Sequence, residues 1–313
     1  MEYAELRSQA NVVRKDIIRM VGAAGSGHPG GSLSCADVLV ALYLGGVLRH
    51  DPQNPSKEDR DRFILAKGHA APALYATLAR AGYFPPEDLI TLRKLGSALQ
   101  GHPDCHLVPG VEVSTGSLGQ GLSIAAGMAA GLKLAENDAA VFAVLGDGEC
   151  EEGQVWEAAM FAAHNGLDNL VAIVDHNGLQ IDGPITEVCN PEDLAEKFAA
   201  FGWDVCTVDG HDMGALVSTL AALRDDRSGK PFAVIAETVK GKGVSYMENQ
   251  AGWHGKAPKG EEIERALADL AAIDEQIAAE AAQAKVAQAE KRSTGFAIGG
   301  VAPTFRETEV AHG

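Results

Sequence analysis

The chain has 313 residues, of which 46% are hydrophobic, so it can bury a sizeable core and wholesale disorder is excluded. Lysine and arginine total 26 against 43 aspartates and glutamates, which gives a formal net charge of -17. Such an acidic chain repels nucleic acid and anionic membrane surfaces, and we expect neither as a partner. It also repels phosphorylated substrates. Any phosphate site must therefore be built locally, from a metal ion, helix N-termini or a few basic side chains.

The cysteines and the first residues of the chain indicate where in the cell the protein is found. Residues 1–20 are charged and lack the apolar run of a signal peptide. The most apolar stretch, residues 33–48, contains Asp37 and is too short to span a bilayer. The cysteines are odd in number, scattered and without a C-x-x-C pair, which is typical of reduced thiols in a cytosol. We therefore predict a soluble, cytoplasmic protein whose free thiols are Cys35, Cys105, Cys150, Cys189 and Cys206.

The first part of the chain predicts helices separated by glycine-rich loops. Apolar residues such as Val13, Ile17 and Val21 recur at helical spacing near the start. The last helix of this part is built from small residues, which suits close packing on a sheet. The predicted elements are a helix at 4–24, a glycine-rich break at 22–32, a helix at 34–48, a strand at 59–66 ending in a loop at 67–69, helices at 72–81 and 85–95, and a segment at 114–134 that starts with a glycine-rich turn and becomes a helix.

From residue 139 on, strands and helices alternate. Continuous apolar runs predict buried strands, and the alternation predicts an α/β fold: a mostly parallel sheet with helices on both faces. The elements are strands at 139–145, 170–174, 204–208 and 232–237, and helices at 151–165 and 214–224. The composition after residue 260, rich in Ala, Glu, Gln and Lys, is typical of a solvent-exposed helix. We predict one α/β domain at 1–260, a helical segment at 261–292 and a tail at 293–313.

Two polar side chains follow consecutive strands of this predicted sheet. Asp147 lies between Gly146 and Gly148, and Asn177 follows the next strand. Because ligands bind at the carboxyl ends of parallel strands, both side chains would reach one crevice. A carboxylate and an amide oxygen suit Mg²⁺, which completes its shell with phosphates and water. Either residue alone would be explained by a helix cap or an Asx turn, but together they favour a metal site.

Residues 146–183, a G-D-G followed by that asparagine, resemble the thiamine diphosphate motif of transketolases. Six other pieces occur in the order of that family, and the resemblance covers roughly residues 4–260. It implies the thiamin-diphosphate-binding fold. The pieces are SGHPGGSLS at 26–34, KGHAAPALY at 67–75, GHPD at 101–104, TGSLGQGLSIAAG at 115–127, VDGHD at 208–212, and KGKGVSYMEN at 240–249 with WHG at 253–255.

The family pattern implies a cofactor site on this chain, with thiamine diphosphate and Mg²⁺ as cofactors. Asp147, Asn177 and the backbone carbonyl of Leu179 would be the protein ligands of Mg²⁺, and diphosphate oxygens and water would complete the shell. The implied cofactor-binding residues are His69, Gly116, Ser117, Leu118, Gly148, Asn177 and His254.

The resemblance also implies roles for histidines. His69 and His254 match histidines near the diphosphate, while His28 and His102 match histidines facing the reactive carbon and the sugar hydroxyls. We expect His28, His102 and His254 to be catalytic, because imidazoles that titrate near neutrality can move hydroxyl protons. Without the resemblance, His102 before Pro103 would be a turn residue and His69 a helix cap. The histidines expected to be structural are His106, His164, His176 and His211.

A partner chain is implied as well. In single-chain transketolases a second domain supplies the glutamate and the aromatic stack for the aminopyrimidine ring. The residues after 260 do not predict another α/β domain. We therefore expect the diphosphate half of a two-component transketolase, assembled as α2β2 with a pyrimidine-half subunit. It would transfer a two-carbon ketol unit from a ketose to an aldose. A pentose-phosphate role is the default, and an unusual sugar is credible.

Two other functions stay open. The G-D-G…N core alone also fits another thiamine enzyme, such as a 2-oxo acid dehydrogenase-like or deoxyxylulose-phosphate synthase-like subunit. SGHPGG, GHPD and GSLGQG together favour transketolase. The second alternative is a non-catalytic cofactor-binding subunit. Whether the sugars are phosphorylated stays undecided, because the family's phosphate-binding arginines lie mostly on the partner half.

Overall fold

A five-stranded parallel sheet forms the centre of the computed structural model, which describes residues 1–295. Its strands are β1 (Arg62–Leu65), β2 (Val141–Gly146), β3 (Leu170–His176), β6 (Asp204–Asp209) and β7 (Phe232–Glu237). The order across the sheet is β1-β2-β3-β7-β6, and every neighbouring pair is parallel. Within β2 and β3, Val141 pairs with Leu170 and Gly146 with Asp175, so both strands end at the same edge.

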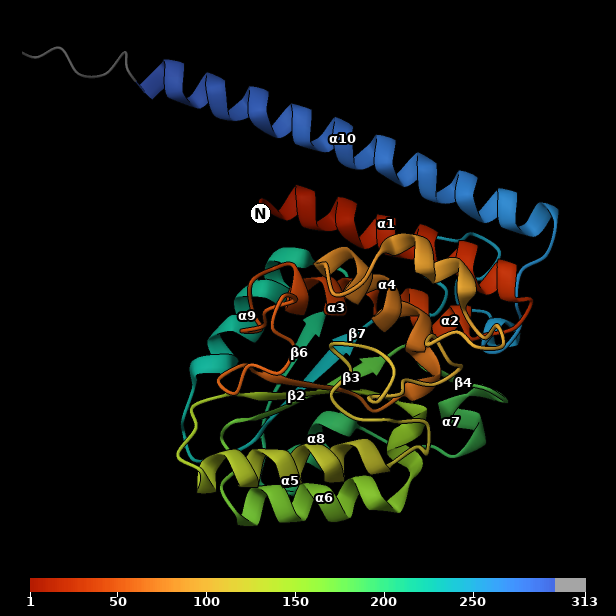
Figure 1. The fold of residues 1–313 in the computed structure, drawn as a ribbon. Helices are drawn as coiled ribbons and strands as arrows, with labels where there is room; N and C mark the ends of the chain where they lie inside the picture. The colour runs from red at the N-terminus through yellow and green to blue at the C-terminus, as the bar shows by residue number, and fades with distance from the viewer. Residues whose placement is uncertain (296–313) are drawn as a thin grey trace, which may run out of the picture.

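One face of the sheet is covered by helices from the first part of the chain together with α9 (Figure 1). They are α1 (Tyr3–Ala24), α2 (Pro29–Ser34), α3 (Ala36–Tyr43), α4 (Ala71–Ala81) and α9 (Met213–Asp225). The long helix α10 (Glu261–Gly295) lies alongside α1, where Asn11 Nδ2 donates a hydrogen bond to the Leu270 carbonyl at 2.6 Å. Phe142 and Val144 of β2 point into this layer and join its core.

The opposite face carries α5 (Gln120–Leu134), α6 (Gly153–His164) and α8 (Leu194–Ala200). Val141, Ala143 and Leu145 of β2 point to this side, as the two-residue alternation of a strand requires. The central strands β2, β3 and β7 are thus buried on both faces, which explains their continuous apolar runs, whereas the edge strand β6 is partly exposed. The predicted α/β fold, a parallel sheet with helices on both faces, is confirmed.

Some local predictions need correction. The segment predicted as a helix at 85–95 contains only the short 3-10 helix η2 (Pro86–Thr91), and α2 begins at Pro29 inside the predicted glycine-rich break. Proline suits a first helical position because it lacks the N–H that would stay unpaired there. Of the predicted tail at 293–313, the first three residues continue α10 and the rest lie outside the described residues. The elements not predicted are η1 (Gly68–Ala70), η3 (Gly148–Glu151), β4 (Leu179–Gln180), β5 (Gly183–Pro184), α7 (Ile185–Val188), α8 and η4 (Ala251–Trp253).

Across the described part of the chain, no helix combines the length and apolar character that crossing a membrane requires.

Candidate active site

Asp147 and Asn177 lie together at the carboxyl edge of the sheet, as the pairing of β2 with β3 requires. Asp147 is 2% exposed, and its carboxylate joins the two strand ends. Its Oδ1 accepts a hydrogen bond from the Gly148 N–H at 2.8 Å, and its Oδ2 accepts one from the Gly178 N–H at 2.5 Å. Burial, followed by the charge of Asp175, raises the pKa of Asp147 above its usual value. A neighbouring cation would therefore stabilise the ionised form.

A second buried carboxylate orients the Asn177 amide. Asn177 Nδ2 donates to Asp175 Oδ2 at 3.3 Å, which turns the amide oxygen away from Asp175. Asp175 also accepts hydrogen bonds from Ser34 Oγ at 2.6 Å and Thr238 Oγ1 at 2.5 Å, and forms an ion pair with Lys67. Burial alone would raise the pKa of Asp175, but Lys67 and the two hydroxyls hold it below its usual value. Asp175 is thus a fixed anion that positions Asn177.

The third predicted metal ligand, the Leu179 carbonyl, accepts a hydrogen bond from Lys240 Nζ at 2.8 Å. Lys240 is 2% exposed, and burial, followed by the charge of Lys67, lowers its pKa to about 8. Two buried lysines therefore stand where the predicted metal ligands converge, although the chain as a whole has a net charge of -17. They are the local basic groups that a phosphate site in so acidic a chain requires.

The glycine-rich loop at 116–118 touches two other site segments. Gly116 has a φ of +144°, and a Cβ on it would lie 2.9 Å from the His102 ring. A Cβ on Gly68 would lie 2.7 Å from the Gly116 nitrogen, so only glycine permits this approach. Glu149 fixes the end of the loop by accepting a hydrogen bond from the Gly119 N–H at 3.0 Å, and burial raises the pKa of Glu149 to about 7.

Three of the predicted histidines form a cluster. The ring centroids of His28 and His69 are 5.3 Å apart, those of His28 and His254 are 5.4 Å apart, and those of His69 and His254 are 5.0 Å apart. His102 is exposed and lies against Gly116 beside this cluster. The Nδ1 atoms of His28 and His254 are buried and have no hydrogen-bond partner within the described residues. Buried polar atoms of this kind point to a ligand.

The cluster does not titrate near neutrality, contrary to the prediction. Burial, followed by the charge of Lys240, lowers the pKa of His254 to about 3. Burial, followed by the charge of Lys67, holds the pKa of His69 well below its usual value. Both imidazoles are therefore uncharged at pH 7, because a protonated ring would be poorly solvated and would face two ammonium groups.

His28 and His102 respond to a different cation. Burial, followed by the charge of Arg93, lowers the pKa of His28 to about 4, and the same two causes lower the pKa of His102. The sequence could not show this, because the shift depends on burial and on how the Arg93 side chain is placed in the fold. All four predicted histidines are thus neutral hydrogen-bonding groups in the chain at pH 7.

The donor set fits a magnesium ion beside a diphosphate. Asp147, Asn177 and Leu179 offer three oxygen donors, which Mg²⁺ prefers, and all three line one hollow of about 200 Å³. Of the other predicted site residues, His28, His102, Gly116 and Ser117 lie outside this lining. The remaining lining residues that concern the site are Lys67, His69, Leu118, Gly148, Lys240 and His254.

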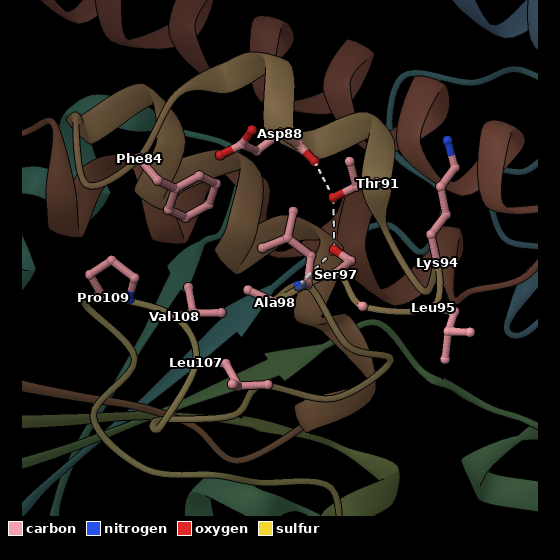
Figure 2. A pocket seen from close by; sticks show the side chains of 12 residues that line it. Phe84, Asp88, Thr91, Lys94, Leu95, Ser97, Ala98, Leu107, Val108 and Pro109 are labelled. Carbon is pink, nitrogen blue, oxygen red and sulfur yellow. Dashed lines mark hydrogen bonds between the residues drawn. The ribbon is translucent and has the colours of Figure 1, made fainter.

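A larger hollow, of about 530 Å³, is lined by none of the predicted site residues. Figure 2 shows that it lies between the segment after Phe84 and the loop at 107–109. Its two hydroxyl side chains are bonded within the wall: Thr91 Oγ1 bonds the Asp88 carbonyl and Ser97 Oγ, both at 2.7 Å. The larger hollow therefore offers apolar volume but no convergent set of free donors, and the smaller one is the candidate site.

The histidines predicted to be structural lie apart from the cluster. His211 Nδ1 bonds Asp37 at 2.7 Å, and its Nε2 accepts from the Val239 N–H at 2.9 Å, so it ties α3 to the segment after β7. His176 bonds Glu237 at 3.0 Å. The other two are exposed: His106, whose possible metal-binding atoms lie near those of Asp104 and Cys105, and His164 at the end of α6.

A parallel sheet with oxygen donors and buried lysines at its carboxyl edge is the arrangement expected of a protein that binds a phosphorylated cofactor. Residues 6–295 match the family model described as "Transketolase, thiamine diphosphate binding domain". The chain belongs to the transketolase family.

Similar proteins include both short subunits and single-chain enzymes. The chain is 44% identical over 266 residues to the 6-deoxy-6-sulfo-D-fructose transketolase subunit SqwG of Clostridium sp., covering 85% of this chain and 96% of the relative. It is 44% identical over 270 residues to an apulose-4-phosphate transketolase subunit from Phocaeicola vulgatus, covering 86% and 94%. The crystal structure of transketolase from Campylobacter jejuni superposes with a TM-score of 0.79 at 35% identity, covering 85% of this chain and 42% of that one.

The two buried lysines and Asp175 were not predicted from the sequence. Lys67 and Lys240 begin the KGH and KGK pieces, so each lysine followed by glycine was a visible signal. Lysine usually lies on the surface, and only the structure shows that both side chains are 2% exposed. Asp175 lies in the run before Asn177, where a charged residue in an otherwise apolar strand was the available clue.

Lys67→Met is expected to lower the free energy of unfolding by about 3–5 kcal/mol, because it leaves the buried Asp175 carboxylate without its cation. Urea unfolding followed by circular dichroism measures the effect. Lys94→Met, at an exposed position, is the control and should change stability by no more than about 0.5 kcal/mol. A loss below about 1 kcal/mol for Lys67→Met would show that the ion pair does not support the site.

Proposed function

We propose that this chain is the diphosphate-binding subunit of a transketolase that uses thiamine diphosphate and Mg²⁺ together with a separate pyrimidine-half subunit. The observation that carries the proposal is the convergence of Asp147, Asn177 and Leu179 with Lys67 and Lys240 on one hollow. The match over 96% and 94% of two relatives named as transketolase subunits supports a subunit role.

Asp147, Asn177 and the Leu179 carbonyl would hold Mg²⁺. Lys67 and Lys240 would supply positive charge to the diphosphate, and the histidine cluster would supply further donors. A bound anion would oppose the charge of the lysines and raise the pKa of the histidines toward neutrality. The low pKa values of the cluster in this chain are therefore compatible with proton transfer in the assembled enzyme.

Thiamine diphosphate supplies, when bound, the ring that stabilises a carbanion while a carbon–carbon bond breaks. His28 and His102 would hold or move protons at the sugar hydroxyls, because an uncharged imidazole accepts an O–H hydrogen bond. His254 and His69 would remain closer to the lysines and the metal ligands. The overall reaction would move a two-carbon ketol unit from a ketose to an aldose.

Exposed apolar surface supports a partner subunit. Leu118 and Ile181 line the hollow and are 38% and 61% exposed. The 15 residues of α5 and the 12 of α6 contain one charged side chain each, whereas 22% of the chain is charged. Met160 and Phe161 are exposed on α6, and open space surrounds Gly127 on α5. A surface of this kind is typical of an interface, and we propose that the pyrimidine-half subunit covers it in an α2β2 assembly.

Two relatives are named for a sulfo sugar and for apulose 4-phosphate. This favours a dedicated sugar over the pentose-phosphate role that the family resemblance alone predicts. A donor–acceptor screen of the chain co-expressed with its partner tests the function. An assembly that binds thiamine diphosphate but transfers no ketol unit would instead be a non-catalytic cofactor-binding complex.

Two histidine variants separate chemistry from binding. His102→Ala is expected to lower turnover by about 100-fold or more and to change cofactor affinity little, because His102 lies outside the hollow. His254→Ala should weaken cofactor binding more, since His254 lines the hollow. Steady-state kinetics and calorimetry of the assembled enzyme measure both effects. His106→Ala, at an exposed position, is the control. Identical kinetic and binding profiles for the two variants would refute separate roles.

A further inference from the structure

Arg93 reaches the two segments that carry His28 and His102. Its Nη1 donates a hydrogen bond to Ser26 Oγ at 3.0 Å. A Cβ on Gly101 would lie 2.9 Å from Arg93 Cζ, so the guanidinium packs on the backbone directly before His102. One cation is thus held beside two predicted catalytic histidines.

The cations around the histidines divide into two groups. Apart from burial, the largest cause that lowers the pKa of His254 is the charge of Lys240, whereas for His102 it is the charge of Arg93. Lys240 belongs to the edge where the predicted metal ligands converge. Arg93 does not line that hollow. Positive charge therefore lies at both ends of the histidine group, Lys240 at one end and Arg93 at the other. A metal-bound diphosphate would explain the presence of Lys240 but not that of Arg93.

The guanidinium is left without an anion. Among residues 1–286, no carboxylate forms an ion pair with Arg93, although the chain has 43 acidic against 26 basic residues. Its one side-chain hydrogen bond leaves most of its five N–H donors free. Its backbone adopts a φ of +58°, which is unfavourable for a residue with a Cβ, and its N–H is fixed to the Leu99 carbonyl at 2.8 Å. Within residues 1–286, Arg93 is thus an exposed cation that has no ion-pair partner and is held at a set position.

We propose that Arg93 binds the terminal oxyanion of the sugar substrate, a phosphate or sulfonate, at the mouth of the histidine group, and so favours anionic over neutral sugars. The inference rests on the proposed function, because it places a sugar against His28 and His102. A guanidinium fork matches a tetrahedral oxyanion with two parallel N–H donors. Arg93 thereby adds, on this chain, an anion contact that the family resemblance places mostly on the partner half.

The test compares Arg93→Gln with wild type in the assembled enzyme, using substrate pairs that differ in one phosphate. The donor arm uses fructose 6-phosphate against fructose, with glycolaldehyde as acceptor. The acceptor arm uses glyceraldehyde 3-phosphate against glyceraldehyde, with erythrulose as donor. The ratio of kcat/KM for the anionic member to that for the neutral member should fall about 10-fold to 100-fold in at least one arm. The arm affected identifies which sugar carries the contact.

Two further variants sharpen the result. Arg93→Lys should give an intermediate ratio, because it keeps the charge and loses the fork. Lys94→Gln should leave the ratio unchanged, because Lys94 is exposed and lines the separate hollow of Figure 2. A wild-type enzyme without preference for the phosphorylated member, or an unchanged ratio in Arg93→Gln, would overturn the proposal.

Calorimetric titrations with fructose 6-phosphate and with glyceraldehyde 3-phosphate separate this inference from the proposed function, since they need no turnover. Binding that weakens about 10-fold in Arg93→Gln supports the contact even in an assembly that transfers no ketol unit, where only the proposed function fails. Equal binding of both sugar phosphates by Arg93→Gln and wild type refutes the contact, whether or not ketol transfer occurs.

Discussion

Asp147→Ala is expected to weaken Mg²⁺-dependent binding of thiamine diphosphate by at least about 100-fold in the assembled enzyme. The substitution removes the charged member of the predicted metal ligands, so the diphosphate charge would be poorly neutralised. The Asp147 carboxylate also accepts backbone hydrogen bonds from Gly148 and Gly178. Losing it would free both strand ends slightly, yet the apolar core of the sheet would keep the fold.

Calorimetry of wild type and Asp147→Ala, with and without Mg²⁺, measures this effect. Asp182→Ala is the matched control, because Asp182 is an exposed carboxylate on the segment that follows Leu179. Urea unfolding and co-purification with the partner should be close to wild type in both variants. If assembled Asp147→Ala binds the cofactor as tightly as wild type, the metal assignment is wrong.

The isolated chain is expected to give no ketol transfer, to bind thiamine diphosphate weakly and to self-associate. The family resemblance implies that a glutamate of the partner half acts on the pyrimidine ring of the cofactor, so ring activation would require that partner. Glu149, Glu151 and Glu152 line the hollow that holds the predicted metal ligands, so they lie at the diphosphate end. Exposed Met160 and Phe161 would favour association of the free subunit.

Analytical ultracentrifugation with and without the partner tests whether the exposed apolar face of α6 is the interface. Phe161→Glu places a charge on the exposed face of α6 and should reduce both self-association and partner binding. Glu264→Gln, on the first turn of α10, is the control. Unimpaired partner binding by Phe161→Glu would show that this face is not the interface.

The central fold could be predicted because buried parallel strands have a plain signature. The apolar runs at 139–145 and 170–174, which lie within or overlap the observed strands β2 and β3, needed no further context. The segment at 85–95 was predicted wrongly because its spacing fits a helix, while Arg93 adopts a left-handed conformation that ends any helix there. β4 and β5 have two residues each, which is too short for any periodicity to appear.

The residues of the candidate site that follow strand ends could be predicted from the sequence. Those whose role depends on being buried could not. Asp147 and Asn177 follow consecutive parallel strands, so their meeting was implied by topology. The inward placement of Lys67 and Lys240 was not, since lysine spacing does not reveal burial. The pKa of His254, about 3, follows from burial and from Lys240, and neither could be read from the position of His254 in the chain.

Ketol transfer measured while the pyrimidine-half partner is added to a fixed amount of this chain tests the account most directly. Both proteins must be purified from cells free of host transketolase, with thiamine diphosphate and Mg²⁺ in excess. We expect no transfer by either protein alone and a rate that rises to a plateau when the two are present in equal molar amounts. Robust transfer by this chain alone, or none at any ratio, would contradict it.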